Sequence, residues 1–119
     1  MIEENTLLTK IIEGIQERKG KSIKIVDLSG IEYATTQGFV ICTGTSSMHV
    51  SAIADSVREY VQAEIGVKPY NYDGYQNSQW IVLDYGTVYV HIFLPEFREL
   101  YNLEQLWSDA SITDVPDED

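Results

Sequence analysis

Apolar residues recur at helical spacing near the start of the chain. These apolar residues are Leu7, Leu8, Ile11, Ile12 and Ile15, and charged residues lie between them. Asn5 or Thr6 can cap the start of this segment, and Gly20 stands where a capping glycine would end it. The pattern predicts an N-terminal amphipathic helix whose apolar stripe packs against a core.

A second segment shows the same spacing after Gly44-Thr45-Ser46-Ser47. Its apolar stripe consists of Val50, Ile53, Ala54, Val57 and Val61. Ser46 or Ser47 is a natural N-cap, and Gly66 is a natural C-terminal stop. The pattern predicts a second amphipathic helix between the serine pair and Gly66.

Five segments predict strands, at residues 23–28, 38–43, 67–72, 80–84 and 88–94. The second run is almost continuously apolar, which is typical of a central strand buried on both faces. Cys42 within it is most simply a small core residue. Pro95 stops the last strand and can open a helix, which continues in short helical pieces through Trp107.

The order of these elements predicts the fold class. Two main helices, each apolar on one side, can cover a mixed sheet of about five strands, so we expect an α/β or α+β domain. A chain of 119 residues has room for one such domain. We assign it to residues 1–111. The segment 112–119 is polar and acidic, and we expect it to be a disordered tail.

The last two strands predict a hairpin that turns at Tyr85-Gly86, with Gly86 at a position that needs a positive φ. After the turn, aliphatic residues alternate with Tyr89, His91 and Phe93, which share the other face of the strand. A two-residue turn pairs Trp80 with His91 and makes one patch of Trp80, Asp84, Tyr89, His91 and Phe93. A bulged three-residue turn shifts the pairing by one and places Trp80 on the aliphatic side. The sequence leaves both registers open.

The charge of the chain narrows the function classes. Its 19 acids and eight bases give a formal net charge of -11, so direct specific binding of nucleic acid is not expected. Residues 69–119 hold ten acids, one base (Arg98) and ten of the thirteen aromatic residues. A surface of carboxylates, Trp and Tyr suits docking of a basic protein. The alternative is that the acids serve solubility and the aromatic residues fill the core.

The sequence gives little support for a membrane protein, a secreted protein or a metal-binding protein. No apolar run approaches the ~20 residues that span a bilayer, and the acidic N-terminus does not resemble a signal peptide. One cysteine and two histidines make a poor zinc set. We therefore expect a soluble, cytoplasmic protein with no metal and no cofactor.

Gly44-Thr45-Ser46 lies between a strand and a helix N-terminus, where backbone N–H groups can hold phosphate. Nucleotidyltransferases use a Gly-Ser pair at such a junction, together with two carboxylates two residues apart on a strand. No predicted strand carries that carboxylate pair, and a plain helix cap explains the serines. His91 and Asp84 are residue types that can act in acid–base catalysis, but no nucleophile accompanies them. His49, in the first helical turn, fits a neutral or capping role.

Several blocks of residues occur in order over residues 5–110. They are Phe39-Val40-Ile41-Cys42-Thr43-Gly44-Thr45-Ser46, His49-Val50-x-Ala52-Ile53-Ala54-Asp55, Gly74, Trp80-Ile81-Val82-Leu83-Asp84-Tyr85-Gly86, Val90-His91-Ile92-Phe93 and Arg98-x-x-Tyr101-x-Leu103-Glu104-x-Leu106-Trp107. In these blocks the chain resembles the ribosomal silencing factor family, also called RsfS or Iojap. It departs from the family pattern at Gln37-Gly38 and at Met48, which affects local contacts and self-association.

The resemblance implies a fold related to nucleotidyltransferases without their catalytic carboxylates, and hence no enzyme. It implies binding to the large ribosomal subunit through ribosomal protein L-fourteen, at the face that meets the small subunit. Such binding blocks subunit joining and represses translation when nutrients are short. The resemblance also implies a homodimer when the protein is free. A nucleotidyltransferase and an acidic scaffold for another basic partner are the alternatives.

We expect the partner-binding residues in the hairpin and in the C-terminal motif. They are Trp80, Asp84, Tyr85, Tyr89, His91, Phe93, Arg98, Tyr101, Leu103 and Trp107. The hairpin aromatic residues are expected to supply most of the binding energy, and the acidic residues are expected to steer association.

Overall fold

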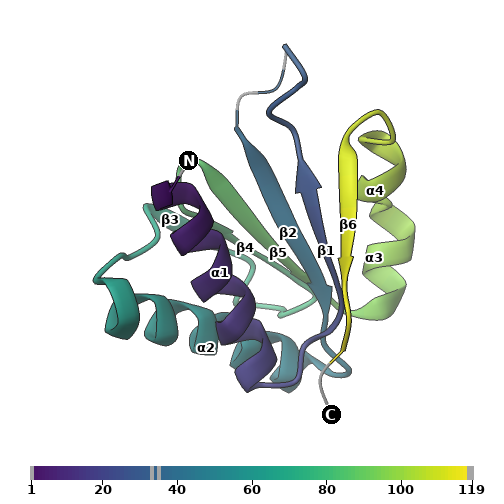
Figure 1. The fold of residues 1–119 in the computed structure, drawn as a ribbon. Helices are drawn as coiled ribbons and strands as arrows, with labels where there is room; N and C mark the ends of the chain where they lie inside the picture. The colour runs from purple at the N-terminus through teal and green to yellow at the C-terminus, as the bar shows by residue number, and fades with distance from the viewer. Residues whose placement is uncertain (1, 33, 35, 118–119) are drawn as a thin grey trace.

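The computed structural model describes residues 2–32, 34 and 36–117, with side chains from Thr6 onward. Its elements are α1 (Ile2–Glu17), β1 (Lys21–Asp27), β2 (Gly38–Thr43), α2 (Ser47–Ile65), β3 (Asn71–Asp73), β4 (Trp80–Asp84), β5 (Val88–Phe93), α3 (Pro95–Tyr101), α4 (Leu103–Leu106) and β6 (Ser111–Val115). The strands form one sheet in the order β3-β4-β5-β2-β1-β6 (Figure 1). Only the β2–β5 pair is parallel, so the sheet is mixed and the predicted fold class is confirmed.

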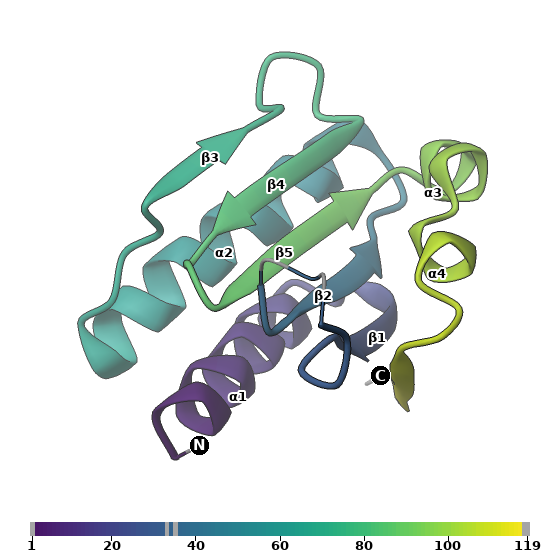
Figure 2. The same cartoon turned by 90° about the horizontal axis from the view of Figure 1, so that it is seen from above.

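Helices cover both faces of the sheet, but unequally. The long helices α1 and α2 lie side by side on one face, and the short helices α3 and α4 lie on the other (Figures 1 and 2). The α1–α2 side holds the larger core, which includes Ile11, Ile53 and Val90. The other side holds a smaller core around Phe39 and Phe93, which Phe97, Leu103 and Trp107 of the short helices cover.

The ends of α2 agree with those predicted from the sequence, whereas the ends of α1 do not. In α2, the Ser46 side chain accepts a hydrogen bond from the His49 N–H at 3.1 Å, and Gly66 ends the helix, as predicted. Helix α1 begins at Ile2, so capping by Asn5 or Thr6 is wrong. Lys19, and not Gly20, takes the left-handed conformation after α1. Gly20 is needed for space, because a Cβ there would overlap the Ile15 side chain.

The C-terminal segment is a strand, which corrects the prediction of a disordered tail. Strand β6 pairs antiparallel with β1 from Ser111 to Val115, opposite Asp27 to Ile23. The reason is that β1 would otherwise be an edge, and pairing satisfies its backbone groups. The Asp117 side chain also accepts the Ser22 N–H at 2.9 Å. The sheet therefore has six strands, while residues 118–119 of the predicted tail lie outside the described residues.

The β4–β5 hairpin has the predicted faces but a different register. Trp80 pairs with Phe93, Val82 with His91 and Asp84 with Tyr89. The Tyr85 N–H bonds to the Val88 carbonyl at 3.0 Å, and Gly86 has a φ of 85°. The turn thus lies at Gly86-Thr87, one residue later than predicted, so both registers that the sequence left open, the Trp80–His91 pair and the bulged three-residue turn, are wrong.

Two side chains of the edge strand β3 accept hydrogen bonds from the backbone N–H group that follows each of them. The Asn71 carboxamide oxygen accepts the Tyr72 N–H at 2.9 Å, and the Asp73 carboxylate accepts the Gly74 N–H at 2.8 Å. All three residues of β3 are exposed. Both N–H groups are therefore already bonded within the chain.

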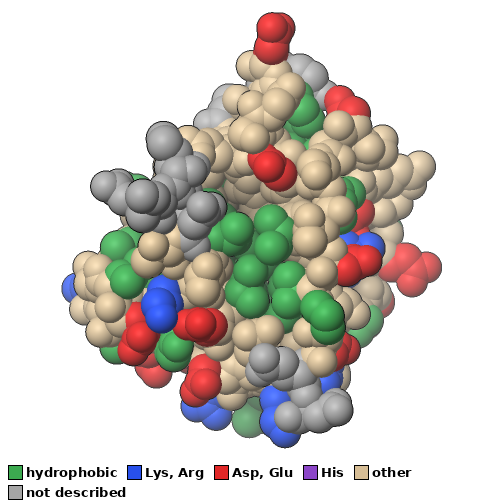
Figure 3. All heavy atoms as spheres, in the orientation of Figure 1, with side chains coloured by type: hydrophobic (Ala, Val, Ile, Leu, Met, Phe, Trp, Pro, Cys, Tyr) green, Lys and Arg blue, Asp and Glu red, His purple; other side chains and the backbone are tan. Residues whose placement is uncertain are grey.

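On the α1 side, the helices leave the β1–β6 end of the sheet partly open. Ile25 on β1 and Val115 on β6 are half-buried. Figure 3 shows apolar side chains gathered at the centre of this face, between α1 and β6, with acidic side chains around them. None of the helices in the described part of the chain is long and apolar enough to cross a membrane.

Gly74, between β3 and β4, should tolerate no side chain. Its φ is 101°, and a Cβ would overlap the Trp80 carbonyl oxygen. We expect Gly74→Ala to lower the free energy of unfolding by about 2 kcal/mol or more, measured by urea denaturation. Gly30→Ala is the matched control, because a Cβ there meets nothing within 4 Å. Equal stabilities of the two variants would contradict this account of the β3–β4 turn.

Candidate protein-binding surface

The face of the hairpin that points away from α1 and α2 carries a cluster of rings. We call Trp80, Tyr89, His91, Phe93 and Tyr101 the aromatic cluster. Trp80 stacks on Phe93, with ring centroids 4.9 Å apart and planes at 20°, and contacts Tyr101 of α3 at 4.7 Å. His91 lies between the Trp80 and Tyr89 rings, 5.9 and 6.5 Å from them. The cluster therefore links both hairpin strands to α3.

His91 is a neutral member of this cluster. The Trp80 indole N–H donates to His91 Nδ1 at 3.0 Å, so this nitrogen carries no proton and the other ring nitrogen does. Burial lowers the pKa of His91 to about 4. The imidazole therefore carries no charge at neutral pH. It also does not pair with Asp84, which accepts the Gly86 N–H at 2.8 Å and caps the turn.

Arg98 attaches the short helices to the sheet. Its guanidinium donates to the Ser22 carbonyl at 2.6 Å and to the Thr43 hydroxyl at 2.8 Å. It also makes two hydrogen bonds to the Glu104 carboxylate, at 3.3 and 3.2 Å. One buried side chain thus ties α3 to β1, to the end of β2 and to α4.

The environment of Glu104 keeps it charged. Partial burial acts to raise the pKa of its carboxyl, but the hydrogen bonds and charge of Arg98, with the charge of Lys24, lower it below its ordinary value. Lys24 of β1 lies 3.5 Å from this carboxylate and 3.7 Å from Asp114 of β6. The two strands and α4 are therefore joined through one network of charges.

The outer surface of the short helices is apolar and exposed. We call Leu100, Tyr101 and Leu106 the α3–α4 outer face. These side chains are 70%, 50% and 69% exposed. The sequence reasoning missed Leu100 and Leu106. A usable signal exists for Leu100, because it stands two residues after the buried Arg98 and so lies nearly opposite it around the helix.

The structure brings together half of the predicted site residues. The five members of the aromatic cluster lie in contact, and Asp84 lies on the same face at the turn. Leu103 and Trp107 are half-buried and cover the smaller core. Phe93 and Arg98 are buried, so they support the surface and do not form it.

Tyr85 is a correction to the predicted site. It is 4% exposed and packs in the core on the α1–α2 side. Its phenol finds no hydrogen-bond partner among the described residues, and burial raises its pKa to about 12. The alternation of β4 contains the signal, because Tyr85 has the same parity as the buried Ile81 and Leu83. Its side chain is not available to a partner in this fold.

Backbone N–H groups at the Gly44–Ser47 junction are hydrogen-bonded to side chains of the same segment. The Thr45 N–H donates to His49 Nδ1 at 2.9 Å, and Ser46 accepts the His49 N–H. His49 Nε2 therefore carries the proton and donates to the Arg18 carbonyl at 2.6 Å. His49 thus has a capping role, as the sequence suggested. Two N–H groups that a phosphate would need are already bonded within the chain.

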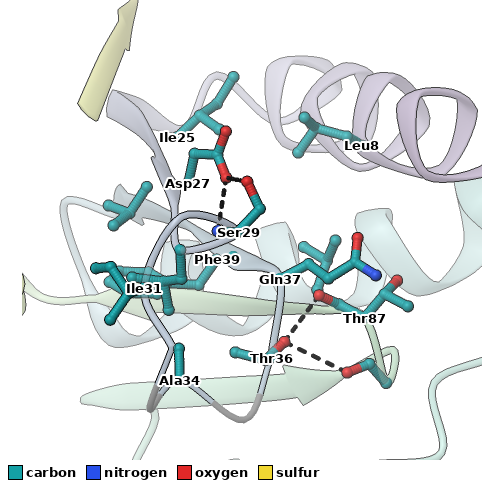
Figure 4. A pocket seen from close by; sticks show the side chains of 15 residues that line it. Leu8, Ile25, Asp27, Ser29, Ile31, Ala34, Thr36, Gln37, Phe39 and Thr87 are labelled. Carbon is teal, nitrogen blue, oxygen red and sulfur yellow. Dashed lines mark hydrogen bonds between the residues drawn. The ribbon is translucent and has the colours of Figure 1, made fainter. Parts of the chain in front are cut away.

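A cavity of about 670 Å³ lies where the 28–37 loop meets the hairpin turn (Figure 4). The Thr36 hydroxyl donates to the Thr87 carbonyl at 2.7 Å and holds the loop to the turn. Asp27 accepts both hydrogen bonds from Ser29, which lower the pKa of its carboxyl. The described lining has no Lys, Arg, His or Cys, and its one ionisable side chain, Asp27, is already hydrogen-bonded to Ser29.

Metal and thiol chemistry find no site in the described part of the chain. There, no group of three or more His, Cys, Asp or Glu lies together so as to hold a metal ion. Cys42 is fully buried, and burial raises the pKa of its thiol to about 12. A thiol in that state is not a nucleophile. The features that stand out are the aromatic cluster and the α3–α4 outer face.

Comparison with known proteins identifies one protein family. The family model described as "Ribosomal silencing factor during starvation" (RsfS) matches residues 2–119. A Haemophilus influenzae protein named ribosomal silencing factor RsfS is 38% identical over 103 residues, which cover 86% of this chain and 98% of that protein. The Halalkalibacterium halodurans protein of that name is 32% identical over 109 residues, 92% of each chain. A crystal structure of a Chromobacterium violaceum protein superposes with a TM-score of 0.81 at 33% identity, covering 87% of this chain and 85% of that one.

Removing Arg98 should release the short helices. Arg98→Met removes the hydrogen bonds that Glu104, Thr43 and the Ser22 carbonyl accept from the guanidinium. We expect the free energy of unfolding to fall by about 3 kcal/mol or more, measured by urea denaturation with Trp fluorescence. Arg18→Met, at an exposed position, should have little effect. A change of less than about 0.5 kcal/mol for Arg98→Met would count against this role.

His91 should make the fold sensitive to acid. Its pKa is about 4 in the folded chain and 6.5 when unperturbed, so below pH 6.5 the unfolded chain binds a proton that the folded chain excludes. The free energy of unfolding should therefore fall as the pH drops from 6.5 toward 4, by up to about 3 kcal/mol.

His91→Asn tests this pH dependence, because its amide oxygen can take the place of Nδ1 as acceptor for Trp80. Urea denaturation at pH 7 and pH 4.5 should show a smaller loss of stability for this variant than for the native chain. Carboxylates such as Glu104 contribute acid sensitivity to both chains, so the difference isolates His91. An equal loss in both chains would rule out this origin.

Proposed function

The chain belongs to the ribosomal silencing factor (RsfS) family, and from this premise we propose that it binds the large ribosomal subunit and blocks its joining to the small subunit. The contact is with ribosomal protein L-fourteen, and the result is repression of translation when nutrients are short. The chain acts by binding a protein surface, not by catalysis or by direct recognition of RNA. Its place of action is the cytoplasm.

The α3–α4 outer face carries this proposal. Leu100, Tyr101 and Leu106 are large apolar side chains held in an exposed position by the buried Arg98. Next to them, Trp80 contributes a ring that Phe93 supports from below. Exposed apolar surface next to a rigid aromatic residue is typical of the centre of a protein-binding site.

The charge around this face favours a basic partner. Residues 69–119 contain ten acids and only Arg98 as a base, and the Arg98 charge is compensated by Glu104. Carboxylates at the rim of an interface raise the association rate with a cation-rich protein more than they raise affinity. The surface therefore combines an apolar centre with an acidic rim, which suits a ribosomal protein.

The nucleotidyltransferase alternative has less support. Nucleotide binding at Gly44-Thr45-Ser46 requires backbone donors, and His49 and Ser46 occupy two of them. We place no activity there.

We also propose that the free protein forms a homodimer. The partly open apolar region between α1 and β6, with the half-buried Ile25 and Val115, supports self-association on that side. Light scattering of the purified chain measures its mass directly.

The α3–α4 outer face can be tested with two substitutions in exposed positions. We expect Leu100→Ala with Leu106→Ala to weaken binding to purified large subunits by about tenfold or more, which corresponds to ~1.4 kcal/mol. Co-sedimentation with subunits measures the affinity. Sucrose gradients with added small subunits measure the block of joining.

Met48→Ala is the control, since Met48 is 82% exposed at the start of α2, away from this face. Circular dichroism should show all variants folded. If the double variant binds as tightly as the native chain, another surface makes the contact.

A further inference from the structure

A groove borders the aromatic cluster on its β3 side. Its volume is about 440 Å³, and the loop between β3 and β4 forms one wall while α3 forms the other. Five aromatic side chains line it, namely Tyr72, Tyr75, Trp80, Phe97 and Tyr101. Side-chain amides and a single carboxylate, Asp73, complete the lining. A groove of this composition offers ring faces, hydrogen-bond acceptors and one negative charge.

The charges near the groove favour a cation as its occupant. Neither Lys nor Arg is among the residues that line it. Arg98, the base of α3, is buried, and its hydrogen bonds go to Glu104, Thr43 and Ser22. Glu96 and Glu99 of α3 are exposed. The α3 wall of the groove and Asp73 therefore carry negative charge, which attracts a positive side chain.

The chain already contains the interaction that such a guest would make. The Arg58 guanidinium of α2 lies 4.0 Å from the centre of the Tyr72 ring and 5.7 Å from that of Tyr75. Arg58 is not one of the residues that line the groove. The rings of Trp80 and Tyr101, 4.7 Å apart at an angle of 41°, face the groove without a cation of this chain above them among the described contacts.

We propose that this groove binds an arginine side chain of the basic protein partner. The planar guanidinium stacks on Trp80 and Tyr101, and its N–H groups bond to Asp73 and to the amides of the 76–79 loop. Arginine fits better than lysine, because an ammonium group cannot stack flat on a ring and is more strongly hydrated. This inference rests on the proposed function only in naming the partner as a ribosomal protein.

The test uses the full chain and three six-residue peptides that alternate glycine with arginine, lysine or citrulline. Citrulline keeps the shape of arginine and removes its charge. Nuclear magnetic resonance follows the two indole N–H signals, where Trp80 reports on the groove and Trp107 lies outside it. We expect the arginine peptide to shift the Trp80 indole signal in a saturable way. The lysine peptide should bind with an affinity about fivefold or more lower, and the citrulline peptide should bind most weakly.

Two variants localise the binding. Tyr101→Leu removes a ring from a half-exposed position, and Asp73→Asn removes the charge but keeps an acceptor for the Gly74 N–H. Each variant should bind the arginine peptide with an affinity about threefold or more lower than that of the native chain. Their controls, Tyr70→Leu and Glu59→Gln, change an exposed ring and an exposed carboxylate outside the groove and should bind as the native chain does.

The outcomes separate this proposal from the proposed function. Equal binding of the three peptides, or binding that the groove variants leave unchanged, overturns the arginine site even if the chain still binds large subunits. Selective binding of the arginine peptide at Trp80 supports the site even if large subunits do not bind. An effect of Tyr101→Leu on subunit binding without any effect on the arginine peptide would also overturn it, since the ring would then act through another contact.

Discussion

The buried guanidinium of Arg98 determines where the short helices lie. Helices α3 and α4 contain seven and four residues, too few to be stable without tertiary contacts. Arg98 bonds to a strand carbonyl, a strand hydroxyl and a helix carboxylate at once. A buried charge of this kind is tolerated only because each of its partners is in place. The exposed Leu100, Tyr101 and Leu106 depend on that arrangement, so the surface and its support are energetically linked.

The aromatic cluster meets a different requirement. A docking surface must lose water when a partner arrives, and desolvating a charge is costly. His91 is already neutral and already holds the Trp80 indole, so covering it removes no charge from water. The charged groups of this half, such as Asp84 at the turn and Glu96 on α3, lie at exposed or half-exposed positions. The apolar centre and the acidic rim are thus separated in space, which suits steering followed by close contact.

Periodicity predicted the fold class, because the apolar stripes of α1 and α2 and the alternation of β4 and β5 depend on local spacing alone. The faces of the hairpin were correct for the same reason, but neither of the two registers left open was right, because Gly86 takes the first position of the turn and not the second. The tail was mispredicted because pairing of β6 depends on β1, some ninety residues away, and not on its own polar composition. For the site, the sequence named the aromatic cluster but could not separate Tyr101 on the surface from Arg98 and Phe93 beneath it, since burial is a tertiary property.

The side-chain caps on β3 make the two edges of the sheet unequal. The Asn71 and Asp73 side chains occupy the N–H groups of Tyr72 and Gly74, whereas β6 at the other edge is exposed and five residues long. A sheet that can extend from both edges can polymerise without limit, as in a fibril. A sheet with one closed edge can join to one other copy and then stops. Tyr70 and Tyr72 can therefore remain exposed at the capped β3 edge without making this molecule the seed of a filament.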